Sequence, residues 1–148
     1  MREMDQLSVL KEIYDETAQQ RNSAIGALQD AQGVLNDARV QLKIAENQAA
    51  TAVAADEAIL AKKKVVEDLY NSSLARPQAL LAKIDALTSE LTDSGDRRKR
   101  AKEIVFAQTK RVSEAETHLA VAQIEVDRVS GEITQLGGEI QRIRSALN

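Results

Sequence analysis

Two short runs of basic residues are the side chains of this sequence best suited to chemistry with a ligand. The first run is Lys62, Lys63 and Lys64, and the second is Arg97, Arg98, Lys99 and Arg100. Clustered Lys and Arg side chains can bind the phosphates of nucleic acid, lipopolysaccharide or a membrane surface. The alternative is a solvated face balanced by nearby acidic residues. The net charge of -3 and the lack of aromatic side chains beside the cations favour this alternative, so we expect no nucleic-acid partner.

Other residue types that support catalysis or metal binding are scarce. The chain has no cysteine and a single histidine, His118. One histidine cannot form the His pair of a metal site, and no residue near it completes a catalytic triad. Carboxylate pairs such as Asp15 and Glu16 are typical of solvated helix faces. We therefore predict no catalytic residue, no metal and no cofactor, in a protein that is not an enzyme.

The composition indicates which elements must position these side chains. Hydrophobic residues make up 43% of the chain, yet aromatic residues only 2%, with one Pro and 29% charged residues. This profile is typical of long helices or a coiled coil. No apolar stretch of about 18 residues is present, so we expect no membrane span. The charged N-terminal residues lack the apolar segment of a signal peptide.

Mostly apolar residues recur with a seven-residue period along both halves of the chain, as they do where the helices of a coiled coil contact each other. We call this line of contact positions the seam. In the first half, the seam consists of Leu7, Leu10, Tyr14, Thr17, Arg21, Ala24, Leu28, Ala31, Leu35, Ala38, Leu42, Ala45, Ala49, Ala52, Ile59 and Val66. In the second half, it consists of Leu80, Ile84, Leu87, Leu91, Ser94, Arg98, Ala101, Val105, Gln108, Val112, Ala115, Leu119, Ala122, Val126, Val129, Ile133, Leu136, Ile140, Ile143 and Leu147. We call the alternating steps of the seam the a and d positions.

Turn-forming residues separate the two halves at 71–77, where Pro77 suits the first turn of a new helix. Two helices joined by a short turn pack antiparallel. Folding there pairs seam residues whose numbers add up to 150, so that large residues meet small ones, as in Leu35 with Ala115. The sequence therefore predicts one all-α helical hairpin, domain 1–148, with arms 3–71 and 77–147.

Some seam layers are polar, and one stretch has turn-like residues. Asp56 and Lys63 fall on the seam, and Asp93–Asp96 contains the residues of a turn or a helix cap. The heptad register continues across this stretch, which favours a kink near 93–97 over a domain boundary. Gly131, Gly137 and Gly138 either fray the second arm or leave room for Tyr14.

The turn is a candidate partner-binding site because its apolar residues lack an obvious partner. The residues that we expect to contact a partner here are Tyr70, Asn71, Leu74, Arg76 and Leu81. Aromatic and Arg side chains tend to carry binding energy at interfaces. The alternative is that Tyr70 and Leu80 only close the end of the seam.

Hydrophobic residues outside the seam widen the apolar stripe beyond that of a two-stranded coiled coil. They are Ile13, Ile25, Val34, Ile44, Val53, Leu60, Val65, Ile104, Phe106, Val121 and Ile124. Either a homodimer or docking on a larger assembly would bury them. The alternative is an isolated hairpin with scattered exposed apolar residues.

Residues 21–48 resemble the coiled-coil arms of colicin-type bacteriocins. The residues that carry the resemblance are Arg21-Asn22, Ala24-Ile25, Leu35-Asn36-Asp37-Ala38-Arg39, Leu42, Ala45-Glu46 and Gln48. In that family a long antiparallel hairpin binds an outer-membrane receptor near its tip and spaces apart the translocation and killing domains. The resemblance implies a receptor-binding tip at Tyr70 to Leu81, and secretion without a signal peptide. It also implies an excised segment, although Met1 resembles an initiator.

Two other functional classes fit the same features. The cytoplasmic stalk or export-chaperone hairpins of flagellar and type III secretion ATPase complexes have a similar length, and their ends insert into a rotary ATPase ring. A generic coiled-coil scaffold subunit requires no special feature. All three classes are non-catalytic and bind a protein partner, and a cytoplasmic location accompanies the stalk.

Overall fold

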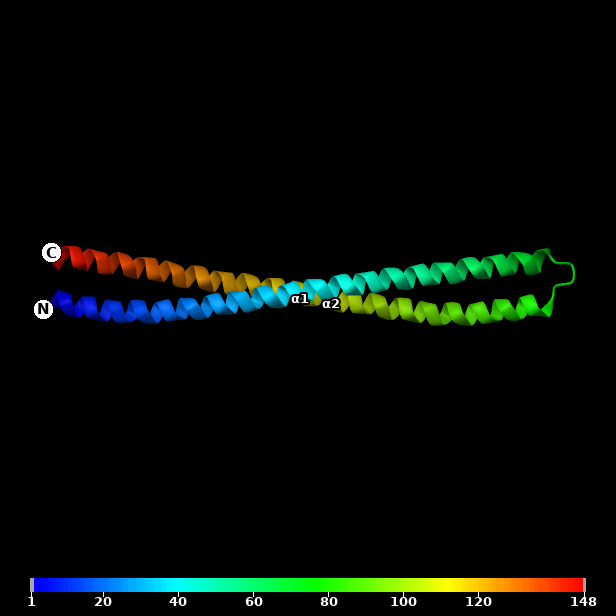
Figure 1. The fold of residues 1–148 in the computed structure, drawn as a ribbon, viewed down its shortest axis with the longest axis horizontal. Helices are drawn as coiled ribbons and strands as arrows, with labels where there is room; N and C mark the ends of the chain where they lie inside the picture. Colours follow the sequence, from blue (N-terminus) through cyan, green and yellow to red (C-terminus); the bar gives the residue numbers. More distant parts are fainter. Residues whose placement is uncertain (1, 148) are drawn as a thin grey trace. The chain divides into compact units, whose positions relative to one another are not determined.

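The computed structural model describes residues 2–147, which form two long helices. Helix α1 spans Arg2–Ser72 and helix α2 spans Gln78–Leu147, with a loop at 73–77 between them. The helices run antiparallel and side by side, so that the start of α1 lies beside the end of α2 (Figure 1). The predicted all-α helical hairpin is confirmed.

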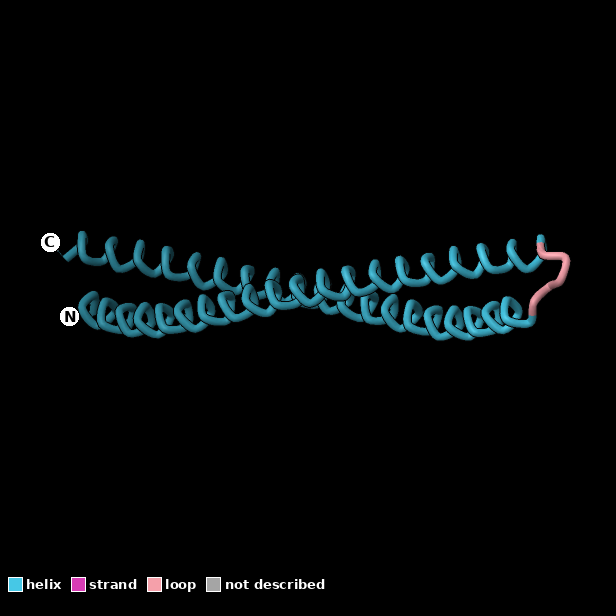
Figure 2. Tube along the Cα trace, turned by 45° about the vertical axis from the view of Figure 1, so that its right-hand side comes forward, coloured by secondary structure: helices cyan, strands magenta, loops and turns pink. Residues whose placement is uncertain are grey.

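The loop ends both helices within one residue of the expected positions (Figure 2). At the end of α1, the Ser73 amide donates a hydrogen bond to the Leu69 carbonyl at 3.0 Å. Pro77 precedes α2, and its carbonyl accepts hydrogen bonds from the Leu80 amide at 3.1 Å and the Leu81 amide at 3.4 Å. Pro77 suits this place because the first turn of a helix does not need its missing N–H.

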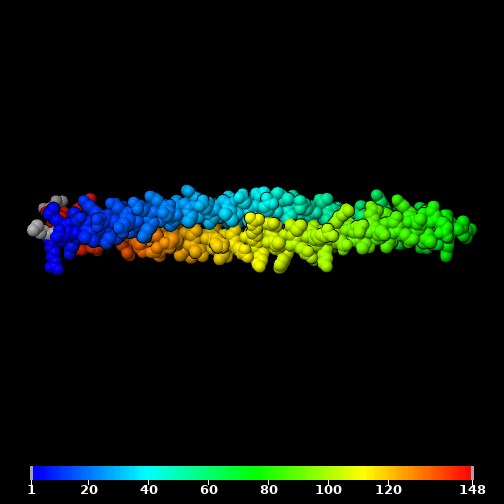
Figure 3. All heavy atoms as spheres, turned by 90° about the horizontal axis from the view of Figure 1, so that it is seen from below, coloured from blue at the N-terminus to red at the C-terminus, as the bar shows by residue number. Residues whose placement is uncertain are grey.

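The chain divides into two compact units, and each contains a part of both helices. Unit 1 consists of Met1–Asp37 with Ser113–Asn148, and unit 2 is Ala38–Val112. In unit 1, the α1 and α2 segments lie directly against each other in the space-filling view (Figure 3). The buried residues of unit 1 are Thr17, Ala24, Leu35, Ala115, Val129, Ile140 and Ile143, and those of unit 2 are Ala38, Ala45, Leu87 and Ser94.

Every one of these buried residues is a seam residue predicted from the heptad repeat. Leu35 and Val129 are the largest fully buried side chains. Thr17 satisfies its hydroxyl by donating to the Ile13 carbonyl at 2.7 Å, which makes its burial tolerable. The small seam residues allow close helix packing, which explains why aromatic side chains are so few.

Helix α2 continues without a break through Asp93–Arg97, so this stretch is not a turn or a cap. Ser94 lies at a seam position and is buried, because the heptad register continues through it and packing outweighs the turn propensity. A kink at this point stays a prediction. The helix also continues through Gly131, Gly137 and Gly138. A Cβ added at Gly137 would lie 3.9 Å from Tyr14 Cε2, an ordinary van der Waals distance, so Gly137 faces Tyr14 across the seam but Tyr14 does not require a glycine there. A Cβ added at Gly131 or Gly138 would meet nothing within 4 Å, so neither of these glycines leaves room for Tyr14.

Candidate functional site

The tip, which we define as residues 70–81, contains the most exposed large apolar side chain of the described chain. Leu74 has a relative exposure of 106%. Asn71 and Arg76 are also exposed, whereas Tyr70 and Leu81 are half-buried. Tyr70 is therefore neither fully buried nor fully exposed, so its role as a partner contact and its role in closing the seam both stay predictions. Four of the five expected contact residues thus lie on or beside the loop, and Leu81 lies in the first turn of α2.

The side chains of Arg76 and Tyr70 lie beside each other at the tip. The Arg76 guanidinium carbon lies 6.0 Å from the centre of the Tyr70 ring, at the outer limit of a cation–π contact. The backbone of Arg76 has a φ of 42°, a left-handed conformation that usually belongs to glycine. Such a conformation costs a residue with a Cβ about 1 kcal/mol. The backbone alone would favour glycine here, and Arg76 instead supplies a cation over an aromatic ring.

The two basic runs both lie in unit 2, and each contains one residue in an ion pair. Lys63 Nζ lies 3.6 Å from Glu67 Oε1, one turn along α1. Arg98 Nη1 donates to Asp56 Oδ2 across the two helices at 3.2 Å. The expected balance by acidic residues is therefore present at Arg98, with Asp56 as its partner. Contact of the remaining cations with an anion stays a prediction.

Asp56 is far less exposed than the acidic side chains of a solvated helix face. Its side chain has a relative exposure of 17%, and Oδ1 is buried without a hydrogen-bond partner in the described part of the chain. Gln108 Oε1, also on the seam of unit 2, is likewise buried without a hydrogen-bond partner in the described part of the chain. Each such buried atom costs about 1–3 kcal/mol of desolvation. Polar seam positions therefore make unit 2 less stable than an apolar seam would.

The surface of unit 1 contains local networks of Arg and Glu side chains. Arg128 donates to both carboxylate oxygens of Glu125, at 3.0 and 2.6 Å, and to Glu132 at 2.6 Å. The hydrogen bonds from Arg128 lower the pKa of Glu125, and the same contact raises the pKa of Arg128. Arg142 bonds to Glu139 at 2.7 Å, which raises the pKa of Arg142.

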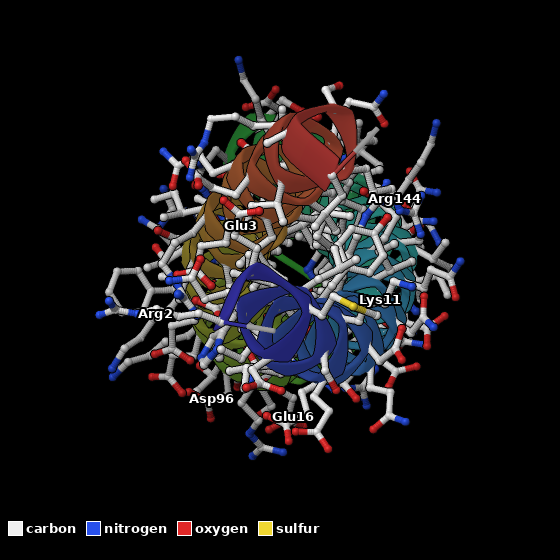
Figure 4. The ribbon with its side chains drawn as sticks, turned by 90° about the vertical axis from the view of Figure 1, so that its left-hand side faces the viewer. Arg2, Glu3, Lys11, Glu16, Asp96 and Arg144 are labelled. Atoms are coloured by element: carbon white, nitrogen blue, oxygen red, sulfur yellow. The ribbon has the colours of Figure 1, made fainter. Side chains whose placement is uncertain are left out.

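Several shallow grooves lie between the helices of unit 1, two of them with volumes of about 790 and 550 Å³. One is lined by Glu16, Gln19, Gln20, Ser23, Ala24, Glu125 and Arg128. The second lies at the end formed by the two termini and is lined by Arg2, Asp5, Gln6, Val9, Leu10, Glu139, Arg142 and Ile143. In the end view, Arg2 and Glu16, both on α1, point outward to solvent (Figure 4). Both grooves are open to solvent and lack the enclosed cavity of a typical small-molecule site.

Most of the predicted off-seam apolar residues are exposed. Nine of the eleven, all except the half-buried Ile25 and Val53, expose between 41% and 75% of their surface. These exposed residues indicate an interface. Sequence reasoning missed Val9, Val40 and Leu69, which are 53%, 56% and 53% exposed. Their positions in the heptad repeat, outside a and d, could have identified them.

Within residues 2–147, neither helix contains a stretch that is long and apolar enough to cross a membrane. In the same range, no three His, Asp or Glu side chains gather closely enough to hold a metal ion. Comparisons of the chain with protein-family models, with curated proteins and with solved structures gave no match.

Proposed function

We propose that this chain is a non-catalytic protein–protein interaction and spacer module that engages a cell-surface receptor through its tip. The observation that carries the proposal is the pairing of a fully exposed Leu74 with the Tyr70–Arg76 contact. The resemblance of residues 21–48 to bacteriocin coiled-coil arms supports the same assignment. The proposed partner is a protein on the outer surface of a Gram-negative cell.

The chemistry of the tip fits the binding of a protein. Burying a fully exposed leucine against a partner is worth about 1.5–3 kcal/mol. Tyr and Arg are enriched among the residues that dominate binding energy, because they combine apolar area with a directed polar group. Arg76 and Tyr70 lie close enough for one partner to contact a cation and an aromatic ring at the same place.

The test is a titration of the fluorescently labelled chain onto intact Gram-negative cells, read by flow cytometry. We expect saturable binding that is lost when the cells are treated with protease. The variant Tyr70→Ala with Leu74→Ala should bind at least about tenfold more weakly. Its far-UV circular dichroism should match that of the original chain, because the remaining seam is intact.

A matched control removes one aromatic and one aliphatic side chain elsewhere. Phe106→Ala with Ile124→Ala truncates residues that are 75% and 67% exposed. This variant should bind as tightly as the original chain. Unchanged binding by the tip variant would refute the proposal, as would equal losses in both variants.

A second candidate function is a stalk or export-chaperone hairpin of a flagellar or type III secretion ATPase complex. The observation in its favour is the groove at the terminal end, where Val9, Leu10 and Ile143 form an apolar lining. If this function holds, Val9→Ala with Leu10→Ala should abolish binding to an isolated ATPase ring, and the tip variant should bind normally. The opposite pattern would exclude this candidate.

A further inference from the structure

The outer surface of α1 contains a regular set of exposed apolar residues. If Leu7 and Leu10 are numbered a and d, the c and g positions lie together on one side of the seam. The large apolar residues at these positions are Val9, Ile13, Val34, Ile44, Val65 and Leu69. We call this set the α1 stripe. Each member exposes between 41% and 60% of its surface.

The spacing within the α1 stripe reads the same in both directions. Successive members are 4, 21, 10, 21 and 4 residues apart. A second copy of α1, laid antiparallel on the first, would therefore align each member with another. Val9 would face Leu69, Ile13 would face Val65, and Val34 would face Ile44. An interface that uses the same surface on both copies needs this self-complementarity.

The charged residues among the same positions agree with that alignment. Between residues 9 and 69, the charged c and g residues are Glu16, Asp30, Asp37 and Lys62. The alignment places Glu16 opposite Lys62. Asp30 and Asp37 would face Gln48 and Gln41, whose amide groups can donate hydrogen bonds to carboxylates. No two like charges would face each other at these positions.

A shift by one heptad removes the match. Sliding one copy by seven residues in one direction places Val9 opposite Lys62. Sliding it the other way places Leu69 opposite Glu16. Each shift places an apolar side chain opposite a charged one, so the sequence favours the unshifted register of the two copies.

The adjacent f positions of α1 are unusual for a solvent-exposed face. From 19 to 61 they are Gln19, Gly26, Gly33, Val40, Asn47, Ala54 and Ala61, without one charge. A Cβ added at Gly26 or Gly33 would meet nothing within 4 Å. The hairpin itself therefore does not require these glycines, which destabilise a helix relative to alanine. The close approach of a second helix would require small residues here.

We propose that a second copy of this chain covers the α1 stripe and forms an antiparallel two-fold dimer, with its axis at the level of residue 39, between Asp37 and Gln41 on the stripe side of α1. Residues 9–37, which belong to unit 1 of one copy, pack against residues 41–69, which belong to unit 2 of the other. The two-fold axis generates the same contact a second time. The inference does not depend on the receptor-binding tip, because the tip begins after Leu69.

The first test measures the mass of the chain in solution by sedimentation equilibrium. The chain should have twice its monomer mass of 16.2 kDa. Val34→Glu should give the monomer mass, because it places an unpaired charge opposite Ile44 twice in the dimer. The matched control Ile124→Glu changes an exposed residue on α2 and should remain dimeric. All variants should keep their far-UV circular dichroism, since these side chains are exposed.

The second test checks the register by exchanging charges. Glu16→Lys alone should weaken the dimer about tenfold, because it places a second cation opposite Lys62 of the other copy at both symmetry-related contacts. Adding Lys62→Glu to that variant should restore the original affinity. A chain that sediments as a monomer up to about 100 µM would overturn the proposal. A dimer that is unaffected by Val34→Glu, or not restored by the exchanged charges, would also overturn it.

Discussion

Helix α1 contains a buried leucine, Leu35, and an exposed leucine, Leu60. Leu35 is 1% exposed and Leu60 is 54% exposed. We expect Leu35→Ala to lower the free energy of unfolding by about 3 kcal/mol, because it removes buried methyl groups and leaves a cavity. Leu60→Ala should change the free energy of unfolding by less than about 0.5 kcal/mol.

The comparison requires urea denaturation at a single protein concentration, since dimerisation adds to the apparent stability. Equal losses for Leu35→Ala and Leu60→Ala would show that the seam residues are wrongly assigned.

The network around Arg128 predicts a dependence of stability on pH. Because Arg128 lowers the pKa of Glu125 in the folded chain, the bond adds stability above the unfolded pKa of about 4.5. That contribution is lost as the pH falls through the lower, folded pKa. The effect is small, since both side chains are exposed and salt screens them.

The measurement is the melting temperature in low salt at pH 7 and pH 3. The difference between the original chain and Arg128→Gln should be larger at pH 7 than at pH 3. The same difference at both values would mean that the Arg128 network does not stabilise the folded chain.

At the scale of the helices, the heptad repeat was sufficient to predict both elements and their buried faces. A seven-residue period sustained through each half leaves one packing solution for two helices joined by a short turn. The turn-like residues Asp93–Asp96 were the exception, because local propensity is weaker than the packing of a continuous seam. The ion pair of Arg98 with Asp56 joins side chains one turn apart in that register.

The antiparallel register itself can be tested in unit 2 with introduced cysteines, since the chain has none of its own. Ala45→Cys with Val105→Cys places two thiols in one seam layer, and we expect a disulfide within a single chain on mild oxidation. Ala45→Cys with Val112→Cys separates the thiols by about 10 Å along the helix and should remain reduced. Peptide mapping distinguishes the two outcomes, and a disulfide only in the second pair would mean a register shifted by one heptad.

At the scale of the whole chain, the sequence predicted the hairpin better than its surfaces. Buried residues follow a simple period, so they can be read from the repeat. The contact of Arg76 with Tyr70 depends on a left-handed backbone in the loop, which the letters of the loop do not reveal. The α1 stripe combines residues on both sides of the boundary between the units, and its symmetry became evident only with the exposure of Val9 and Leu69.

Partner binding at the tip is the central proposal for this chain. Its most direct test is hydrogen–deuterium exchange of the chain bound to outer-membrane vesicles from Gram-negative cells, compared with the free chain. We expect slower exchange on binding in residues 70–81, and unchanged exchange in residues 2–10 and 140–147. Slower exchange at the terminal residues, with an unchanged tip, would contradict the claim.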